Sequence, residues 1–160
     1  MQVGTKIIDM TKMKLITSIF TIIIAMATNA NAQWSVQTSG KINDFHSVQF
    51  IDANNGYVVG DDDGAGSGAM IMKTTNGGTT WTPQVSNIYS ILNSLHFTDI
   101  NTGYAVGGSG YILKTINGGS AWTALTSNAT ANLKSISFSN ATTAYVVGSG
   151  GTIIKTTNSV

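Results

Sequence analysis

The sequence predicts an all-β protein: a β-propeller of four-stranded antiparallel blades, with about three blades present as an incomplete ring. One observation is a phrase of turn-forming residues that recurs every 41 residues as "KTTNGGTTW", "KTINGGSAW" and "KTTNSV". The other is that short runs of β-branched and aromatic residues, bounded by Gly, Asn and Thr, lie between these phrases, as is typical of strands. Four short strands in every ~40 residues are the unit of a propeller blade.

Each repeat unit begins at a tryptophan that precedes a phenylalanine by sixteen residues. The phrases that open on these phenylalanines, "FIDANNGYVVG", "FTDINTGYAVG" and "FSNATTAYVVG", are in register, and a second apolar strand follows each. The first unit is six residues longer because "DDDGAGSGAM" is inserted between its strands. We therefore expect units that start near residues 34, 81 and 122, each with an outer strand at the tryptophan that completes the preceding blade.

Residues 1–32 have the layout of a secretory signal peptide. From Met13, the expected start of translation, a lysine precedes an apolar run that ends in the small residues of "NANAQ", which predicts cleavage before Gln33. The apolar run is shorter than the ~20 residues that a bilayer span needs, so no stable span is expected after cleavage, and a membrane anchor is the alternative. The repeat region, 33–160, is expected to be exported to the periplasm, cell surface or medium of a bacterium.

The repeat region carries little charge. It holds five lysines and six aspartates, a net charge of −1, and it has no arginine, glutamate or cysteine. This composition offers no basic surface for nucleic acid or anionic lipid. Because no disulfide can form, stability must come from packing and sheet hydrogen bonds, and no cofactor is implied.

The phrases "TTNGGTTW" and "TINGGSAW" resemble the Asp-box, or bacterial neuraminidase repeat, whose pattern is S/T-x-D-x-G-x-T-W. The longer phrase "GYAVGGSGYILKTINGGSAWT" is similar to the propeller family of photosystem II stability and assembly factors. The resemblance implies a hairpin that stabilises the fold, in which an acidic side chain binds turn amides and the tryptophan packs over the turn. The residues that correspond to the pattern are Thr74, Asn76, Gly78, Thr80, Trp81, Thr115, Asn117, Gly119, Trp122, Thr156 and Asn158.

The chemistry of these residues favours a structural role over ligand contact. Asn76 and Asn117 stand where the pattern has aspartate, and asparagine can accept the same amide hydrogen bonds in an Asx-turn. Gly78 and Gly119 would supply a left-handed conformation at little cost. The tryptophans would bury a large apolar area beside the turn.

A glycoside hydrolase fragment is one alternative, because Asp-box propellers include sialidases and xyloglucan-active enzymes. Sialidases bind the substrate carboxylate with arginines, which this chain lacks. Other glycosidases need a pair of carboxylates. Asp52 and Asp99 hold equivalent turn positions, and Asp44 has no counterpart in the repeat. No catalytic residue is predicted, and an enzyme would need further blades to supply one.

The insertion offers weak candidates for a metal site. The carboxylates of Asp61, Asp62 and Asp63 are adjacent and repel one another. A hard cation bound by their oxygens would reduce this repulsion. Their spacing is not the alternating pattern of a calcium loop, which favours a solvated insertion and no metal. As the one non-repeated loop, the insertion remains the best candidate for a specific contact. His96 is expected to face the neighbouring blade or solvent. A zinc site is not expected there, because the sequence places no second histidine or cysteine near it.

The leading functional hypothesis is a non-enzymatic exported propeller module that binds a protein or glycan partner, with a photosystem II assembly role implied by resemblance alone. The second alternative, beside the hydrolase, is a structural repeat region of a larger cell-surface protein. Three blades are fewer than the 4–8 of typical propellers. Either the chain is a fragment, or two copies close a six-blade ring in which Trp34 of one completes the hairpin at Lys155–Asn158 of the other.

Overall fold

The structure is a computed structural model that describes residues 34–62 and 68–158. The predicted signal peptide and Asp63 lie outside the described residues. The chain divides into two compact units, Met1–Val36 and Gln37–Val160. In the first unit only residues 34–36 are described, and they have no regular secondary structure. The second unit holds every strand that the structure describes.

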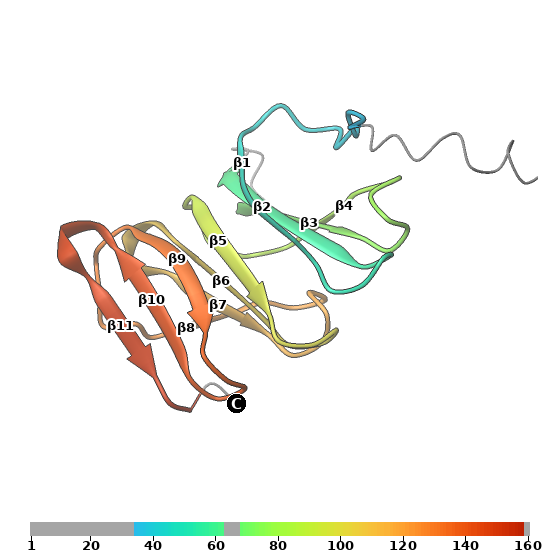
Figure 1. The fold of residues 1–160 in the computed structure, drawn as a ribbon. Helices are drawn as coiled ribbons and strands as arrows, with labels where there is room; N and C mark the ends of the chain where they lie inside the picture. The colour runs from blue at the N-terminus through green and yellow to red at the C-terminus, as the bar shows by residue number, and fades with distance from the viewer. Residues whose placement is uncertain (1–33, 63–67, 159–160) are drawn as a thin grey trace, which may run out of the picture. The chain divides into compact units, whose positions relative to one another are not determined.

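The second unit is built of three antiparallel sheets that follow one another along the chain (Figure 1). The first two sheets have four strands each and the third has three, and within each sheet consecutive strands are neighbours. The strands are β1 Phe45–Phe50, β2 Gly56–Asp62, β3 Ala69–Thr74 and β4 Thr82–Gln84, then β5 Leu92–Phe97, β6 Gly103–Gly107, β7 Ile112–Thr115 and β8 Thr123–Leu125, then β9 Leu133–Phe138, β10 Ala144–Gly148 and β11 Ile153–Thr156.

This arrangement confirms the all-β class and the blade-like repeat. The strand after each of Trp81 and Trp122 pairs with the last strand of the preceding sheet, β4 with β3 and β8 with β7, as the repeat predicts. Two 3-10 turns, η1 Gly108–Gly110 and η2 Ser149–Gly151, are the helical segments of the described chain. Within the described ranges, no helix has the length and apolar character needed to cross a bilayer.

The outer strand predicted at Trp34 is absent, since residues 34–38 have no strand assignment. The reason is that an outer strand takes its hydrogen bonds from the sheet that precedes it. The strand after Trp81 pairs with β3, and the strand after Trp122 pairs with β7. The described residues include no sheet before β1 with which a strand at Trp34 could pair.

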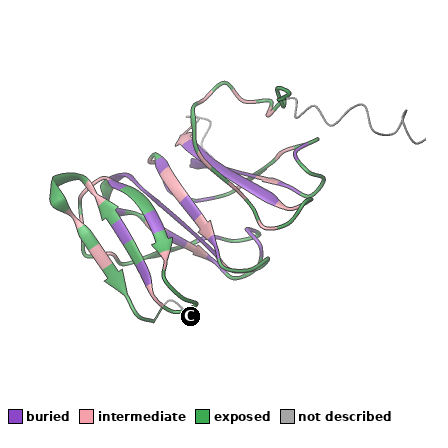
Figure 2. Cartoon of the chain, in the orientation of Figure 1, coloured by how far each residue is buried: buried purple, intermediate pink, exposed green. Residues whose placement is uncertain are grey.

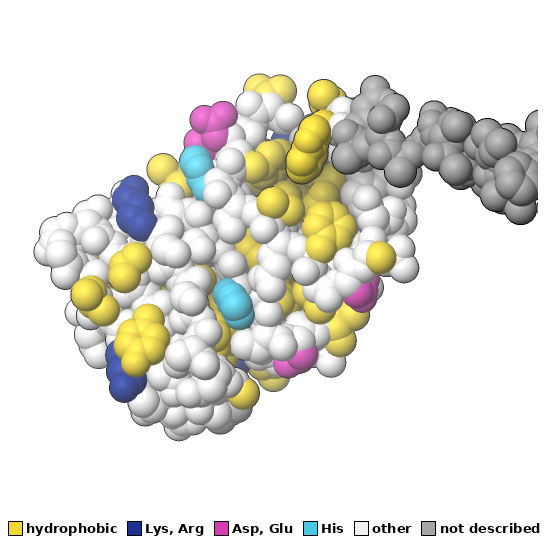
Figure 3. Space-filling model, in the orientation of Figure 1, with side chains coloured by type: hydrophobic (Ala, Val, Ile, Leu, Met, Phe, Trp, Pro, Cys, Tyr) yellow, Lys and Arg dark blue, Asp and Glu magenta, His cyan; other side chains and the backbone are white. Residues whose placement is uncertain are grey.

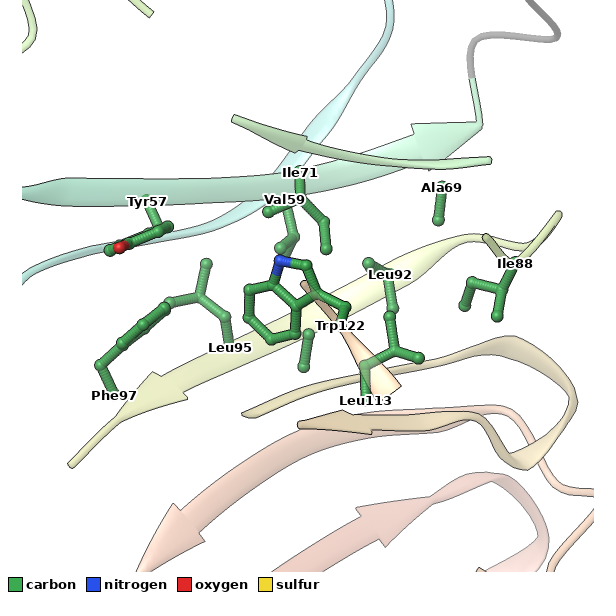
Figure 4. Packing of buried hydrophobic residues seen from close by; sticks show 11 residues of the cluster. Tyr57, Val59, Ala69, Ile71, Ile88, Leu92, Leu95, Phe97, Leu113 and Trp122 are labelled. Carbon is green, nitrogen blue, oxygen red and sulfur yellow. The ribbon is translucent and has the colours of Figure 1, made fainter. Parts of the chain in front are cut away.

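The core lies between the sheets, because each blade is apolar on both faces. A first cluster joins the first and second sheets and includes Tyr57, Val59 and Ile71 on one side and Leu95 and Phe97 on the other (Figure 4). A second cluster joins the second and third sheets in the same way. Figure 2 shows that burial is greatest in the middle strands of the first two sheets, whereas β11 is largely exposed.

Candidate functional site

The first Asp-box-like turn, residues 74–81, is held by two side chains. Thr74 Oγ1 accepts a hydrogen bond of 2.9 Å from the amide of Gly78, and it donates to Asn76 Oδ1 over 3.0 Å. Asn76 Oδ1 in turn accepts from the amide of Thr80 over 2.9 Å, and Asn76 Nδ2 donates to Thr80 Oγ1 over 2.9 Å. The asparagine therefore makes its amide contact without a negative charge.

The second turn, residues 115–122, has the same geometry. Thr115 Oγ1 accepts from the amide of Gly119 over 2.9 Å, and Asn117 Oδ1 accepts from the amide of Ala121 over 2.9 Å. Gly78 and Gly119 have φ values of 88° and 83°, a left-handed conformation that favours glycine. Of the third turn, the structure describes the bond from the amide of Asn158 to Thr156 Oγ1, 3.3 Å long. These contacts fit a structural role, which stays a prediction until mutants are measured.

The two turn tryptophans differ in burial. Trp122 is 6% exposed and lies in the cluster between the first and second sheets, where its ring meets that of Phe97 edge-on at 6.0 Å (Figure 4). Trp81 meets Phe50 edge-on at 6.1 Å and packs on Met70 and Met72, but this face of the first sheet has no neighbouring sheet among the described residues, and Trp81 is half-buried.

A tyrosine–lysine pair ties the first sheet to the second turn, a contact that was not expected from the sequence. Tyr57 Oη and Lys73 Nζ both donate to the carbonyl oxygen of Gly118, over 2.7 and 2.8 Å. Lys73 Nζ also lies 5.4 Å from the centre of the Tyr57 ring. The signal was present in the sequence, since every unit carries a tyrosine in its "GY" or "AY" pair and a lysine in "KT".

Two of the candidate carboxylates hold turns. Asp52 Oδ1 accepts hydrogen bonds of 2.7 Å from the amides of Asn54 and Asn55, and Asp99 Oδ1 accepts from the amides of Asn101 and Thr102 over 2.7 and 2.9 Å. The side-chain hydrogen bond from Asn55, followed by its amide bond, lowers the pKa of Asp52. The amide bonds from Asn101 and Thr102 lower the pKa of Asp99. Both residues are turn residues, as the repeat predicts.

The remaining described acidic residues gather at the opposite end of the first sheet. There His46 Nε2 lies 2.7 Å from Asp61 Oδ1, and the side chain of Asn43 donates to the carbonyl oxygen of Asp62 over 3.4 Å. We call Asp44, His46, Asp61 and Asp62 the acidic end; the insertion leaves the sheet from here. Within residues 34–62 and 68–158, no three His, Cys, Asp or Glu side chains are arranged so that they could hold a metal ion together. Charged side chains are sparse over the face shown in Figure 3.

His96 faces the neighbouring blade, which was one of the two placements expected for it. Its ring stacks on Phe138 of the third sheet at 4.8 Å and 22°. Burial lowers the pKa of His96 below its ordinary value. The residue at the same place in the first unit, Gln49, also reaches the next sheet, where its Oε1 accepts from the amide of Phe97 over 2.7 Å.

Together, the three sheets, the Asp-box-like turns and the tryptophans packed beside them define the class of this protein as an Asp-box-like β-propeller. Among propellers, the chain is similar to the photosystem II assembly factors: a family model described as photosynthesis system II assembly factor YCF48 matches residues 82–157. No curated protein matches the chain.

Solved structures show the same likeness. The structure of YCF48 bound to a D1 peptide is 26% identical, with a TM-score of 0.67, and the match covers 83% of this chain and 42% of that one. YCF48 from Cyanidioschyzon merolae is 19% identical, with a TM-score of 0.65, over 80% of this chain and 41% of that one. An ancestral GH74 enzyme is 23% identical, with a TM-score of 0.62, over 82% and 19%. The chain thus spans less than half the length of these propellers.

Proposed function

We propose that this chain is a non-enzymatic, exported propeller module that binds a protein partner during assembly. The observation that carries the proposal is the likeness to YCF48 solved with a bound D1 peptide, at 26% identity over 83% of this chain. The packing supports it, since the repeated aromatic residues Tyr57, Phe97 and Trp122 are engaged between sheets and serve the scaffold. A glycan is the alternative partner.

Within the described residues, the acidic end is the part of the blades that departs from the repeat. Its His46–Asp61 pair has no counterpart in the other units, and the side chains are 31% and 35% exposed. Exposed polar residues on a non-repeated loop of a rigid scaffold are a common place for specific contacts. We therefore place the partner's contact at this end of the first sheet.

The test is a titration of fluorescently labelled D1 peptide against the full chain, followed by anisotropy, with a scrambled peptide as control. We expect saturable binding of the D1 peptide, weakened about tenfold or more by the double substitution His46→Ala and Asp61→Ala. The matched control is Asp52→Asn, which lies at the other end of the same sheet and should leave the affinity unchanged. Equal binding of both peptides, or none, would contradict the proposal.

A hydrolase is the second candidate, because two GH74 enzymes share the fold at 23% and 20% identity. A likeness at this level concerns the fold, and activity depends on a pair of carboxylates across the scissile bond. Asp52 and Asp99 are occupied by turn amides. We expect no release of reducing sugar from xyloglucan, and measured turnover would favour the hydrolase.

Export is proposed from the sequence of residues 1–32. The expected product in the exported fraction begins at Gln33, and mass spectrometry of the intact protein measures this directly. A mass that includes residues 1–32 would contradict cleavage. A structural repeat region of a larger surface protein stays an alternative that the same mass addresses, since a longer product would reveal further sequence.

A further inference from the structure

The second Asp-box-like turn places an asparagine directly before a glycine. Asn117 is followed by Gly118, and in the first turn Asn76 is followed by Gly77, so both turns read Asn-Gly-Gly. The side-chain amide of an asparagine can be attacked by the backbone nitrogen of the next residue. Glycine favours this attack because it has no side chain in the way and restricts the backbone least. Each turn therefore contains an asparagine that can lose ammonia without an enzyme.

The fold requires the glycine that makes Asn117 reactive. Gly118 has a φ of 64°, in the left-handed region that favours glycine. A Cβ at this position would lie 3.2 Å from the carbonyl oxygen of Ile100, 3.3 Å from Lys73 Nζ and 3.5 Å from Tyr57 Oη. Any other residue would be strained in its backbone and crowded by these atoms. The turn therefore cannot exchange this glycine for a residue that would slow the reaction.

In the folded chain, the groups that would react are held by other contacts. The amide of Gly118 donates to the carbonyl oxygen of Asn101 over 2.9 Å. Asn117 Oδ1 accepts from the hydroxyl of Thr115 over 3.0 Å and from the amide of Ala121 over 2.9 Å. Ring closure requires the Gly118 nitrogen to lose its proton and to reach the side-chain carbon of Asn117, so these bonds must open first. The rate of the reaction is therefore set by local opening of the turn.

The first sheet holds this turn closed. Tyr57 Oη and Lys73 Nζ both donate to the carbonyl oxygen of Gly118, over 2.7 and 2.8 Å. The bond from the lysine has a charged donor, which makes it stronger than a neutral one. Tyr57 is fully buried and its ring stacks on Phe97 of the second sheet, so the contact persists while the two sheets are packed together. Opening the turn therefore also requires the loss of two contacts between sheets.

We propose that Asn117 is a site of spontaneous deamidation, controlled by the contact between the first and second sheets. While Tyr57 and Lys73 hold the carbonyl oxygen of Gly118, the side chain of Asn117 remains an amide. When the two sheets separate at this point, the turn opens and Asn117 reacts with water as the only co-reactant. The modified residue is a lasting mark of that separation, and it is independent of the partner contact proposed for the acidic end.

The reaction exchanges the side-chain amide of Asn117 for a carboxyl group. The Gly118 nitrogen, after losing its proton to solvent, forms a bond to the side-chain carbon, and ammonia leaves with a proton from water to give a cyclic imide. Water then opens the imide at either of its carbonyl carbons. Opening at the side-chain carbon gives aspartate, and opening at the backbone carbon gives isoaspartate. The net change is the uptake of water and the release of ammonia.

The two products have different effects on the turn. Aspartate is the residue of the Asp-box pattern, and its carboxylate can still accept the amide of Ala121, as the carboxylate of Asp99 accepts the amides of its own turn. Isoaspartate lengthens the backbone by a methylene group before Gly118. The bonds within the turn and the bonds from the first sheet then cannot all re-form, so the contact between the two sheets stays weakened.

Peptide mapping by mass spectrometry of the full chain measures the reaction at each asparagine, because the exchange of NH₂ for OH changes the mass. In urea, Asn76 and Asn117 should react at similar rates, since both precede two glycines. In the folded chain at the same pH and temperature, Asn117 should react at least about tenfold more slowly. The double variant Tyr57→Phe and Lys73→Met, which removes both donors and keeps the ring and the aliphatic stem, should raise the folded-state rate at Asn117 about tenfold.

The matched control is Tyr104→Phe with Lys114→Met, the same change one unit further along the chain, which should leave the rate at Asn117 unchanged. Asn76 is the internal control, because general destabilisation by the first double variant would raise its rate as well. Three results would overturn the proposal: a rate at Asn117 that is as fast in the folded parent as in urea, a double variant that leaves this rate unchanged, or equal acceleration at both asparagines.

Discussion

Trp81 and Trp122 show how one repeat position acquires two environments. Both follow an Asp-box-like turn and both meet a phenylalanine edge-on at about 6 Å. Trp122 is enclosed by two sheets, whereas Trp81 covers the outer face of the first sheet and remains half-buried. Because the benefit of an aromatic side chain scales with the apolar area removed from water, the two should contribute differently to stability.

Trp122→Ala is expected to lower the free energy of unfolding by about 3–5 kcal/mol, the usual cost of removing a buried aromatic ring. Trp81→Ala should cost about 1–2 kcal/mol, since part of its ring is already in water. Urea denaturation of the two variants measures both values. Trp122→Phe is the milder control, because Trp122 Nε1 is buried without a hydrogen-bond partner in the part of the chain that the structure describes. Equal losses at the two positions would contradict the difference in burial.

Gly103 lies beneath the ring of Phe97, and a Cβ there would come within 2.5 Å of ring atoms. Phe97 stacks on Tyr57 at 4.0 Å and 18°, so the ring has little room to move. Gly103→Ala is expected to cost about 1–3 kcal/mol of unfolding free energy through overpacking, measured by thermal or urea denaturation.

The third unit supplies the control for that experiment. It has Ala144 where the first two units have glycine, and its Phe138 is tilted 46° against Tyr104 in place of a stack. Ala144→Gly should therefore change stability by no more than the ~0.5–1 kcal/mol that glycine costs in a strand. If Gly103→Ala lowered the free energy of unfolding by no more than Ala144→Gly changes it, the close packing of Phe97 on Gly103 would not explain the glycine at this position.

The turns after β1, β5 and β9 show how one element is built from different residues. The first two use Asp52 and Asp99, and the third uses Asn140, whose Oδ1 accepts from the amides of Thr142 and Thr143 over 3.0 and 2.9 Å. The oxygen that accepts these amides is the common requirement. The charge is dispensable for the turn, and it makes the first two turns sensitive to acid.

Asp99→Asn is predicted to keep the fold and to remove part of its acid sensitivity. The folded pKa of Asp99 lies below the ordinary 3.8, so its contribution is present above pH 3.8 and is lost as the pH falls through the folded pKa. The variant should match the parent at pH 7 and lose less stability as the pH falls below about 4. Denaturation midpoints across that range measure the effect, which is small because the group is exposed. Identical pH profiles would contradict it.

The second unit of the chain is a series of sheets, joined by residues that reach from one sheet to the next. Gln49 bonds the backbone of Phe97, Tyr57 and Lys73 bond the turn at Gly118, and His96 stacks on Phe138. Each sheet contacts mainly its neighbours, as in repeat proteins whose stability is a sum of units and interfaces. A change that weakens one interface between two sheets is therefore expected to lower the stability of those two sheets most.

His96 makes the interface between the second and third sheets sensitive to pH. Burial holds its folded pKa below the ordinary 6.5, so the stability is full above pH 6.5 and falls as the pH drops from there toward the folded pKa. His96→Gln, which copies Gln49 of the first unit, should remove this slope. Unfolding midpoints between about pH 7.5 and pH 5 give the comparison, and His46 is present in both proteins. A variant with the parent's slope would show that another group causes it.

Much of the fold follows from the sequence because strands and turns are local. The recurring tyrosine, lysine and tryptophan align the three units in the sequence. This alignment correctly predicts that β4 pairs with β3 and β8 with β7. The contacts to the carbonyl oxygen of Gly118 were missed, since they join residues 61 and 45 positions apart. The outer strand at Trp34 stays a prediction, because such a strand pairs with a preceding sheet and the described residues include none before β1.

The sequence by itself determined the all-β class, the three units, the turn residues and the position of the insertion, all of which depend on local propensity and periodicity. The tertiary structure decided which of the residues at equivalent positions of the repeat are buried. Val59 is fully buried, whereas its counterpart Val147 is 43% exposed. It also revealed a cavity lined by residues of the second and third sheets. The physical reason is that a residue is buried when two sheets pack against each other. The repeat gives every sheet similar apolar faces, but it does not specify which of these faces is covered by another sheet.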